Sequence, residues 1–259
     1  MKRLIMGASA VILGLLGAIS GLGSQSAAGP YIGFMLGYVD PKAAAAAAIH
    51  AFWVCIGAII AYTVPGHGAI PWAIVVLYTA GATIGAVIAA PLAAPLAGVR
   101  RLLQGLAFPG LIYILALSAG RRFGGLEALP WEVLRSPGGW ALAGAACGAM
   151  ARVGALPIGV LVVPALVFGA DLSPAVASVT ALAIAALAAL LPVLGYTASR
   201  IVDPPMGRTL NVGGALGGAA GGYALAAGAN ASSTWPLQSF CVVAMLLCAW
   251  LIQRSRMQN

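Results

Sequence analysis

Apolar residues run along this chain in long stretches that glycine, proline and charged residues separate. A helix needs about 20 predominantly apolar residues to cross the hydrocarbon core of a bilayer. The series of stretches therefore predicts an all-α membrane protein with ten hydrophobic helical segments. These segments are residues 4–20, 25–39, 43–64, 70–97, 103–120, 138–152, 155–170, 173–197, 208–229 and 235–252.

Two pairs of neighbouring segments are short for a full crossing: the first with the second, and the sixth with the seventh. The second segment also contains Pro30 among several glycines, and an internal proline bends or breaks a helix. We expect each pair to form a short hairpin that is re-entrant or broken.

The two halves of the chain share landmarks at a shift of 133 or 134 residues. Asp40-Pro41 corresponds to Ser173-Pro174, and Pro30 corresponds to Pro164. This regularity predicts an internal repeat of five segments per half. Because five is odd, the second repeat has the opposite orientation in the membrane, an arrangement typical of secondary transporters. The predicted units are residues 1–120, an extracytoplasmic linker at 121–137, and residues 138–259.

Composition supports the membrane assignment, since 62% of the residues are hydrophobic and only 7% are charged. A soluble domain carries about 25% charged residues to face water. The net charge of +8 comes from basic residues that occur singly or in pairs, so we expect no nucleic-acid partner. The four cysteines lie in apolar segments without a CxxC motif, which indicates neither a disulfide framework nor a metal site.

The distribution of basic residues predicts the orientation. With a cytoplasmic N-terminus, ten of the 13 basic residues fall on the cytoplasmic side, as the positive-inside rule requires. We expect a multi-pass protein of the plasma membrane, such as a bacterial inner membrane, with both termini cytoplasmic. The basic, apolar N-terminus resembles a signal peptide, but we interpret it as a retained membrane segment.

The stretch GLGSQSAAGP at residues 21–30 places polar side chains between two apolar segments. A turn inside the bilayer must satisfy its backbone N–H groups without water, and helix N-termini there suit an anion. Ser24, Gln25 and Ser26 would add hydrogen-bond donors. The structural alternative is that these residues only cap a short turn.

Arg152 precedes Gly154 at the turn of the second hairpin. A re-entrant turn would place this arginine deep in the membrane, at a cost of about 2.5–3.5 kcal/mol unless an anion or partner compensates. Both residues are therefore candidates for anion binding. If the hairpin crosses fully, Arg152 is only a loop charge that sets topology.

His50 and Trp53 lie three residues apart near the centre of the third segment, where the second half has Ala183 and Ala186. This asymmetry is expected at a substrate site, where a histidine donates to an anion or carries a coupling proton. The alternative is a histidine bonded to a helix carbonyl, with the tryptophan in packing. Ser178 and Thr180 are weaker candidates, because such hydroxyls usually bond their own helix.

Other features limit the chemistry. No acidic residue lies within a segment, and we find no nucleophile–base pair, phosphate-binding loop or metal-ligand cluster. We therefore expect neither an enzyme nor a cofactor. Glycines repeat every four residues at 213–221 and 214–222, a spacing that favours close helix packing.

The second half resembles a known family. Its GALPIGVLVVPALVFGADLSPAVASVT and NVGGALGGAAGGYALA are similar to the glycine-rich and Pro-Ala-Val-Ala-Ser motifs of the sulfite exporter TauE/SafE family, and GLGSQSAAGPYIGFMLGYVDPKAAAAAA follows the same plan more loosely. The resemblance implies a transporter of small anions such as sulfite or short organosulfonates. Export is the direction that it favours, and a homodimer is the oligomeric state that it implies. Ser24-Gln25-Ser26 replaces part of the usual glycine run.

Two other functions stay open at this point. A channel-like facilitator would use the same anion site without coupling to a second solute. A non-transporting membrane assembly subunit would share the composition but move no anion. The partners we expect are the lipid bilayer and a small anionic solute.

Overall fold

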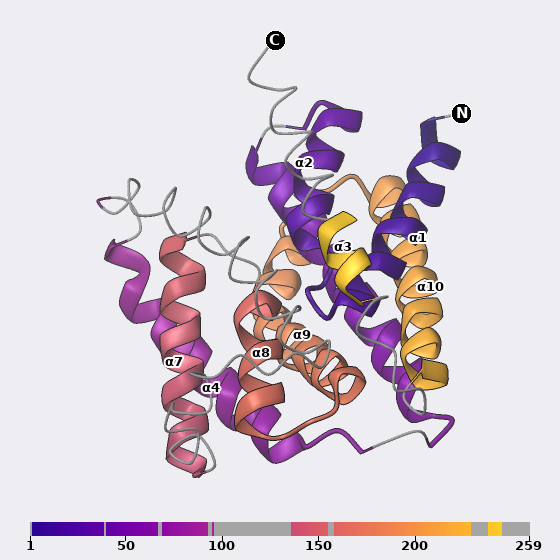
Figure 1. The fold of residues 1–259 in the computed structure, drawn as a ribbon. Coiled ribbons are helices and arrows are strands. Elements are labelled where there is room, and N and C mark those ends of the chain that lie inside the picture. The colour runs from indigo at the N-terminus through magenta and orange to yellow at the C-terminus, as the bar shows by residue number, and fades with distance from the viewer. Residues whose placement is uncertain are drawn as a thin grey trace.

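The computed structural model describes residues 2–38, 40–66, 69–92, 95, 136–154, 158–228 and 238–244. Within these ranges the chain is helical, without strands (Figure 1). The predicted segment 103–120, most of the linker and most of the last segment lie outside them. The elements are α1 (Lys2–Ser20), α2 (Gln25–Leu36), α3 (Asp40–Thr63), α4 (Trp72–Ala89), η1 (Ala90–Leu92), α7 (Pro137–Gly154), α8 (Ile158–Gly169), α9 (Pro174–Ala198) and α10 (Pro204–Gly228); residues 238–244 are also helical.

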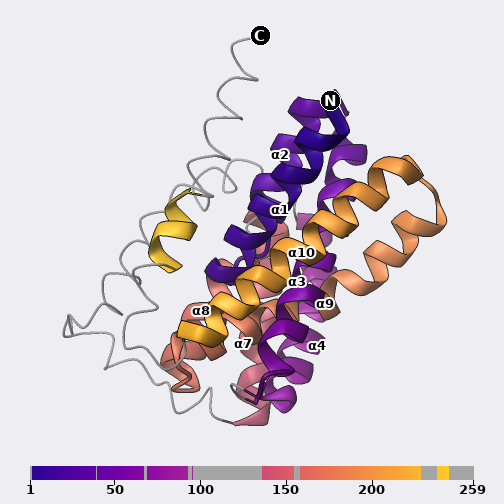
Figure 2. The same cartoon turned by 90° about the vertical axis from the view of Figure 1, so that its right-hand side faces the viewer.

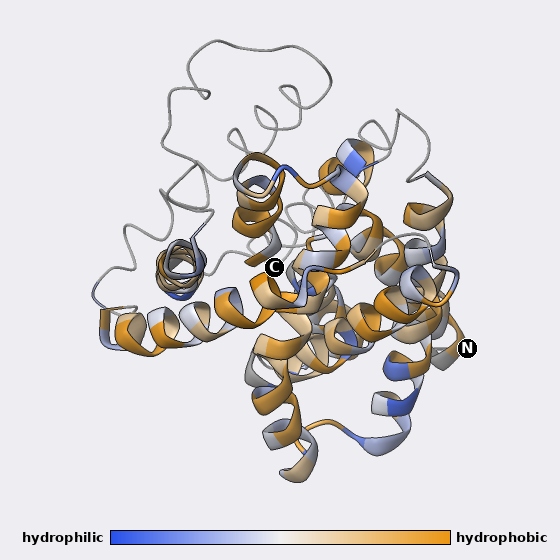
Figure 3. Ribbon diagram, turned by 90° about the horizontal axis from the view of Figure 1, so that it is seen from below, coloured by the Kyte–Doolittle hydropathy of each residue, from blue (hydrophilic) through white to orange (hydrophobic). Residues whose placement is uncertain are grey.

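Three stretches of the described chain are long and apolar enough to cross a membrane: Lys42–Thr63, Trp72–Leu92 and Pro174–Ala198. Large apolar side chains such as Val76, Ile84 and Leu191 are exposed on these helices. Hydrophobic residues dominate the helices, and hydrophilic residues are scattered among them (Figure 3). The chain is therefore a membrane-associated helical protein.

Of the four segments predicted to be short, the second and the seventh are short helices, whereas α1 and α7 are 19 and 18 residues long. α2 and α8 are 12 residues each, and each has an internal proline, Pro30 and Pro164. Residues 21–24 connect α1 to α2, and residues 155–157 separate α7 from α8. Neither α2 nor α8 reaches the length that a crossing requires.

Glycines on two faces of α10 allow it to pack closely against α1 and α3. Gly213, Gly217 and Gly221 face α1, whereas Gly214, Gly218 and Gly222 face α3. A Cβ at Gly217 would lie 2.1 Å from the carbonyl oxygen of Val11, and one at Gly218 would lie 2.1 Å from that of Val54. Successive glycines of α10 contact successively later residues of α1 and of α3, so the three helices run parallel. The packing role predicted for both glycine rows is confirmed.

α4 and α7 form a second pair in the same way. A Cβ at Gly85 would lie 1.9 Å from the oxygen of Ala145, and one at Gly148 would lie 2.0 Å from that of Ala82. These two helices lie on the opposite side of the molecule from α1 and α10 (Figures 1 and 2). α9 contacts α3, α4 and α8, and so connects the two groups.

Candidate functional site

The turn between α1 and α2, which we call the elbow (residues 20–24), is buried inside the protein. Gly21 and Gly23 make the turn with φ of 70° and 67°, a region that disfavours side chains. Gly21 has a second constraint, because an added Cβ would lie 2.8 Å from the Ser178 hydroxyl oxygen on α9. The elbow therefore depends on glycine both for its backbone conformation and for its contact with α9.

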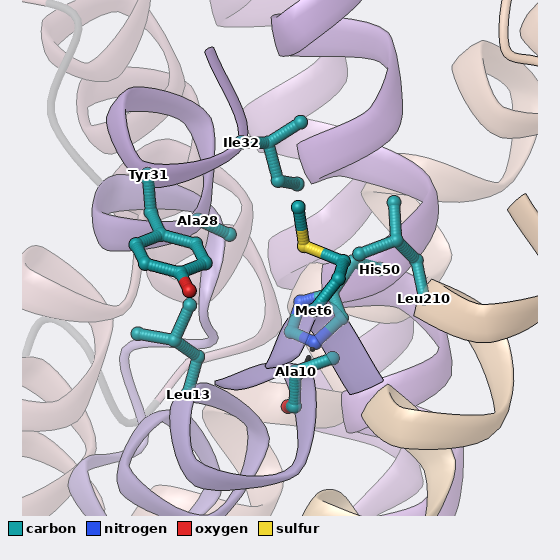
Figure 4. A pocket seen from close by; sticks show the side chains of 8 residues that line it. All are labelled: Met6, Ala10, Leu13, Ala28, Tyr31, Ile32, His50 and Leu210. Carbon is teal, nitrogen blue, oxygen red and sulfur yellow. Dashed lines mark hydrogen bonds between the residues drawn. The ribbon is translucent and has the colours of Figure 1, made fainter. Parts of the chain in front are cut away.

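Ser24 is the residue immediately before α2, but its side chain does not cap the helix. Its hydroxyl oxygen instead lies 2.7 Å from Nδ1 of His50 on α3. The other ring nitrogen, Nε2, lies 3.0 Å from the Ala10 carbonyl oxygen on α1 (Figure 4). Ser24 is 0% exposed and His50 is 1% exposed, so this chain of hydrogen bonds connects three helices in the interior.

The surroundings of His50 are otherwise largely apolar. A narrow crevice, which has no room for a water molecule, lies between α1, α2, α3 and α10 beside the ring (Figure 4). Met6, Ile32 and Leu210 line it, together with Tyr31. The Tyr31 hydroxyl is hydrogen-bonded to Ser9. His50 is thus held in place by packing as well as by hydrogen bonds.

The first turn of α8 lies directly against the elbow. A Cβ at Gly159 would lie 2.3 Å from the Gly21 carbonyl oxygen and 2.7 Å from Cα of Leu22. Because α2 begins three residues beyond Leu22, the N-terminal ends of the two short helices lie near each other. Helix N-termini carry partial positive charge, so their convergence favours a negative group between them.

α9 contributes polar groups to the other side of the elbow. Gln238 donates from Nε2 to the Ser178 hydroxyl at 3.0 Å and to the Pro174 carbonyl at 3.2 Å. Thr180, two residues further along α9, is buried, and its hydroxyl has no partner in the described part of the chain. Thr63 and Thr197, in contrast, bond the carbonyl four residues earlier. Thr180 therefore retains an unused hydrogen-bonding group in the interior.

The structure brings Ser24 and His50 together and places the predicted Ser178 at the same elbow. Gln25, one residue beyond Ser24, is exposed, and the side chain of Ser26 lies outside the described residues.

Trp53 differs from its neighbour His50, since it is 37% exposed and lies outside the buried cluster. Its indole donates to the amide oxygen of Asn211 on α10 at 3.3 Å, in the amide orientation that also bonds the Gly207 carbonyl. Arg152 is exposed in the last turn of α7, which ends at Gly154. Trp53 and Arg152 are therefore not part of the buried cluster.

Sequence reasoning missed two buried polar residues, Ser20 and Gln238. Ser20 accepts from the Leu22 amide within the elbow at 3.3 Å. Both carry the signal that singled out Ser178, a polar side chain in an apolar segment. Gln238 lies in the last predicted segment, whose contact with α9 is not visible from the sequence.

The cluster contains both hydrogen-bond donors and hydrogen-bond acceptors. In the described ranges no group of three His, Cys, Asp or Glu side chains is placed to hold a metal ion. The chain matches no known family model, no curated protein and no solved structure. The geometry around the elbow is therefore the main guide to function.

Proposed function

We propose that this chain is a secondary transporter of small anions that binds its substrate at the elbow, between the two short helical hairpins. One observation carries the proposal: the first turn of α8 lies against the buried elbow at Gly21 and Leu22. Helices that end in the interior of a membrane protein are tolerated where they line a site, and their N-termini suit anionic groups.

An inverted repeat of five segments per half would explain the helix pairing. α2 and α8 have the same length, and their prolines occupy nearly the same position. The first helix of each half packs against the fourth helix of the other half, α1 with α10 and α7 with α4, in both cases through glycines. In this arrangement the hairpins enter from opposite sides, and their turns meet at mid-membrane.

Neutral groups at the elbow would bind an anion without a buried lysine. Ser178 offers a hydroxyl, Thr180 has an unused one, and Ser24 lies at the start of α2. Arg152 adds a positive charge shortly before the start of α8 along the chain. The halves differ at these positions, since Ala183 occupies the place corresponding to His50. Such asymmetry fits an asymmetric substrate.

The family resemblance supplies the substrate class. It favours sulfite or short organosulfonates, exported across the plasma membrane by a homodimer with both termini cytoplasmic. Tetrahedral and pyramidal oxyanions of this kind accept several hydrogen bonds at once, which suits converging N–H and hydroxyl donors.

The first test is ligand-induced thermal shift of the purified protein with sulfite, sulfate, taurine, sulfoacetate and simple carboxylates. We expect at least one oxyanion to raise the melting temperature. Arg152→Ala should abolish that shift if the arginine binds the anion. Arg208→Ala, an exposed arginine near the start of α10, is the matched control and should retain it. An unchanged affinity in Arg152→Ala would make that residue a loop charge.

The second test is flux of the same labelled anions into proteoliposomes. Flux that responds to a pH gradient or to a counter-solute supports a secondary transporter. Flux independent of both indicates a channel-like facilitator. If no anion binds and none crosses, the proposal is wrong, and a non-transporting assembly subunit becomes the better interpretation.

A further inference from the structure

We propose that His50 and Ser24 form a proton-binding relay that couples anion binding at the elbow to the uptake of one proton. The inference rests on the proposed function and adds the identity of the coupled ion. Its basis is the hydrogen-bond direction that the buried chain Ala10–His50–Ser24 imposes.

The direction follows from the acceptor on α1. The Ala10 carbonyl oxygen can only accept, so Nε2 of His50 carries the proton and donates to it. In a neutral imidazole the other nitrogen, Nδ1, then has no proton and accepts. The Ser24 hydroxyl must therefore donate to Nδ1, which uses its single proton inside the protein.

Protonation of His50 reverses the second bond. An imidazolium donates from both nitrogens, so Nδ1 would donate to the Ser24 oxygen, and Ala10 would still accept from Nε2. The Ser24 O–H group keeps its proton and is then free to donate a hydrogen bond to another acceptor. Ser24 lies at the start of α2, two residues beyond Leu22, which contacts the first turn of α8, so an anion bound between these helix ends would receive that hydrogen bond.

The surroundings of His50 make protonation depend on the anion. The described residues that line the crevice from α1, α2 and α10 include no acidic or basic side chain. Among these lining residues, Tyr31 is the one titratable group. The buried stretch of α9 contributes Ser178 and Thr180 but no ionisable group. An isolated buried cation is costly, and a nearby anion offsets that cost. By thermodynamic reciprocity, the proton strengthens anion binding as much as the anion strengthens proton binding.

The stoichiometry follows from the asymmetry of the halves. Ile158 and Ala183 occupy the second-half positions that correspond to Ser24 and His50. Since only the first half carries the relay, we expect one proton per anion in each chain.

The test is calorimetric titration of the purified full chain with sulfate, whose charge does not change near neutral pH. Titrations in buffers of different ionisation enthalpy give the number of protons taken up, and a pH series gives the affinity. We expect uptake approaching one proton, with the dissociation constant rising about tenfold per pH unit above the pH where His50 loses its proton. If sulfate does not bind, a non-titrating alkyl sulfonate such as methanesulfonate replaces it.

Two variants identify the residues. His50→Gln retains an amide donor toward the Ala10 carbonyl but has no titratable proton, so it should bind the anion with no proton uptake. Ser24→Ala keeps the His50–Ala10 bond but removes the hydroxyl, and should weaken binding at least tenfold. Ser199→Ala, an exposed serine at the end of α9, is the matched control and should behave as the wild type. If His50→Gln does not fold, His50→Asn and Ser24→Ala carry the test.

The outcomes separate the two proposals. Anion binding without proton uptake, or proton uptake that persists in His50→Gln, overturns the coupling but leaves the anion transporter intact. If neither sulfate nor the sulfonate binds and no anion crosses proteoliposomes, both proposals fail. Proton uptake that is lost in His50→Gln while melting temperature is preserved supports the relay over a purely structural role for His50.

Discussion

At the scale of single residues, glycine determines how closely the helices approach. The absence of Cβ at Gly218 lets its Cα lie against the carbonyl oxygen of Val54. Weak Cα–H···O contacts and close dispersion contacts stabilise such interfaces. Alanine is a better helix former than glycine by about 1 kcal/mol, so the presence of glycine here is explained by packing and not by propensity.

We predict that Gly218→Ala destabilises the protein by about 1–3 kcal/mol, the usual cost of overpacking a well-packed core. The added Cβ would lie 2.1 Å from a backbone oxygen, so α3 and α10 would have to separate. Thermal unfolding in detergent measures the effect. Gly195→Ala is the control, because a Cβ there meets nothing within 4 Å. It should equal the wild type or exceed it slightly, and equal melting of the two variants would contradict the packing argument.

At the scale of elements, an exposed cluster connects the α2–α3 junction to the loop between α9 and α10. Asp203 accepts from the Tyr38 hydroxyl at 2.8 Å and from Lys42 Nζ at 3.1 Å, and Lys42 lies 4.3 Å from the Tyr38 ring centre. The hydrogen bond from Tyr38, followed by that from Lys42, lowers the pKa of Asp203. Burial, reinforced by Asp203, raises the pKa of Tyr38 to about 12.

The two shifts predict how pH affects the junction. Because the Asp203 pKa is lower when folded, its contribution is complete above the ordinary aspartate pKa of about 4 and is lost as the pH falls further. The Tyr38 pKa is raised, so its contribution is complete below pH 10 and is lost between about 10 and 12. We expect the melting-temperature difference between wild type and Asp203→Asn to be constant from about pH 5 to 9 and to vanish in acid.

Salt and Tyr38→Phe provide the controls for that measurement. An exposed ion pair is screened, so the difference should shrink at high ionic strength. Tyr38→Phe should reduce the part of the melting-temperature difference that is lost in acid. The reason is that the Tyr38 phenol donates the hydrogen bond that lowers the Asp203 pKa most. A difference that is unchanged at pH 3 would show that the carboxylate contributes nothing to the junction.

At the scale of the whole molecule, orientation is the prediction to test. We expect fluorescent-protein fusions at both termini to report a cytoplasmic location, and a periplasmic alkaline-phosphatase reporter in the 121–137 linker to be active, because ten of the 13 basic residues then lie inside. Substituting aspartate for the three linker arginines, Arg121, Arg122 and Arg135, should not invert the orientation of the protein in the membrane. A periplasmic signal from both termini would contradict the orientation, and termini on opposite sides of the membrane would also contradict the repeat of five segments per half.

Much of the secondary structure was predictable from the sequence. The segment predicted at 173–197 is α9 (Pro174–Ala198), and the segment predicted at 25–39 is the shorter α2 (Gln25–Leu36). Proline and glycine account for this success, because they act on the local backbone. α10 begins at Pro204, before the predicted 208, since proline is favourable in the first helical turn.

The candidate site was predictable only in part. Ser24, His50 and Ser178 were visible as polar residues in apolar segments, and all three are buried near the elbow. Trp53 follows His50 by three residues but lies outside the cluster, because neighbouring helices leave that side of α3 open. Gln238 was missed, since its partner Ser178 is far away in sequence.

The sequence by itself determined that this chain is helical and membrane-associated, because hydropathy and backbone restriction are local properties of the residues. Only the tertiary structure decided which polar groups meet: Ser24 with His50, Gln238 with Ser178, and Gly159 with the elbow. Those contacts join helices that are distant along the chain. They depend on how closely α1, α3, α8 and α9 approach one another, which no local pattern specifies.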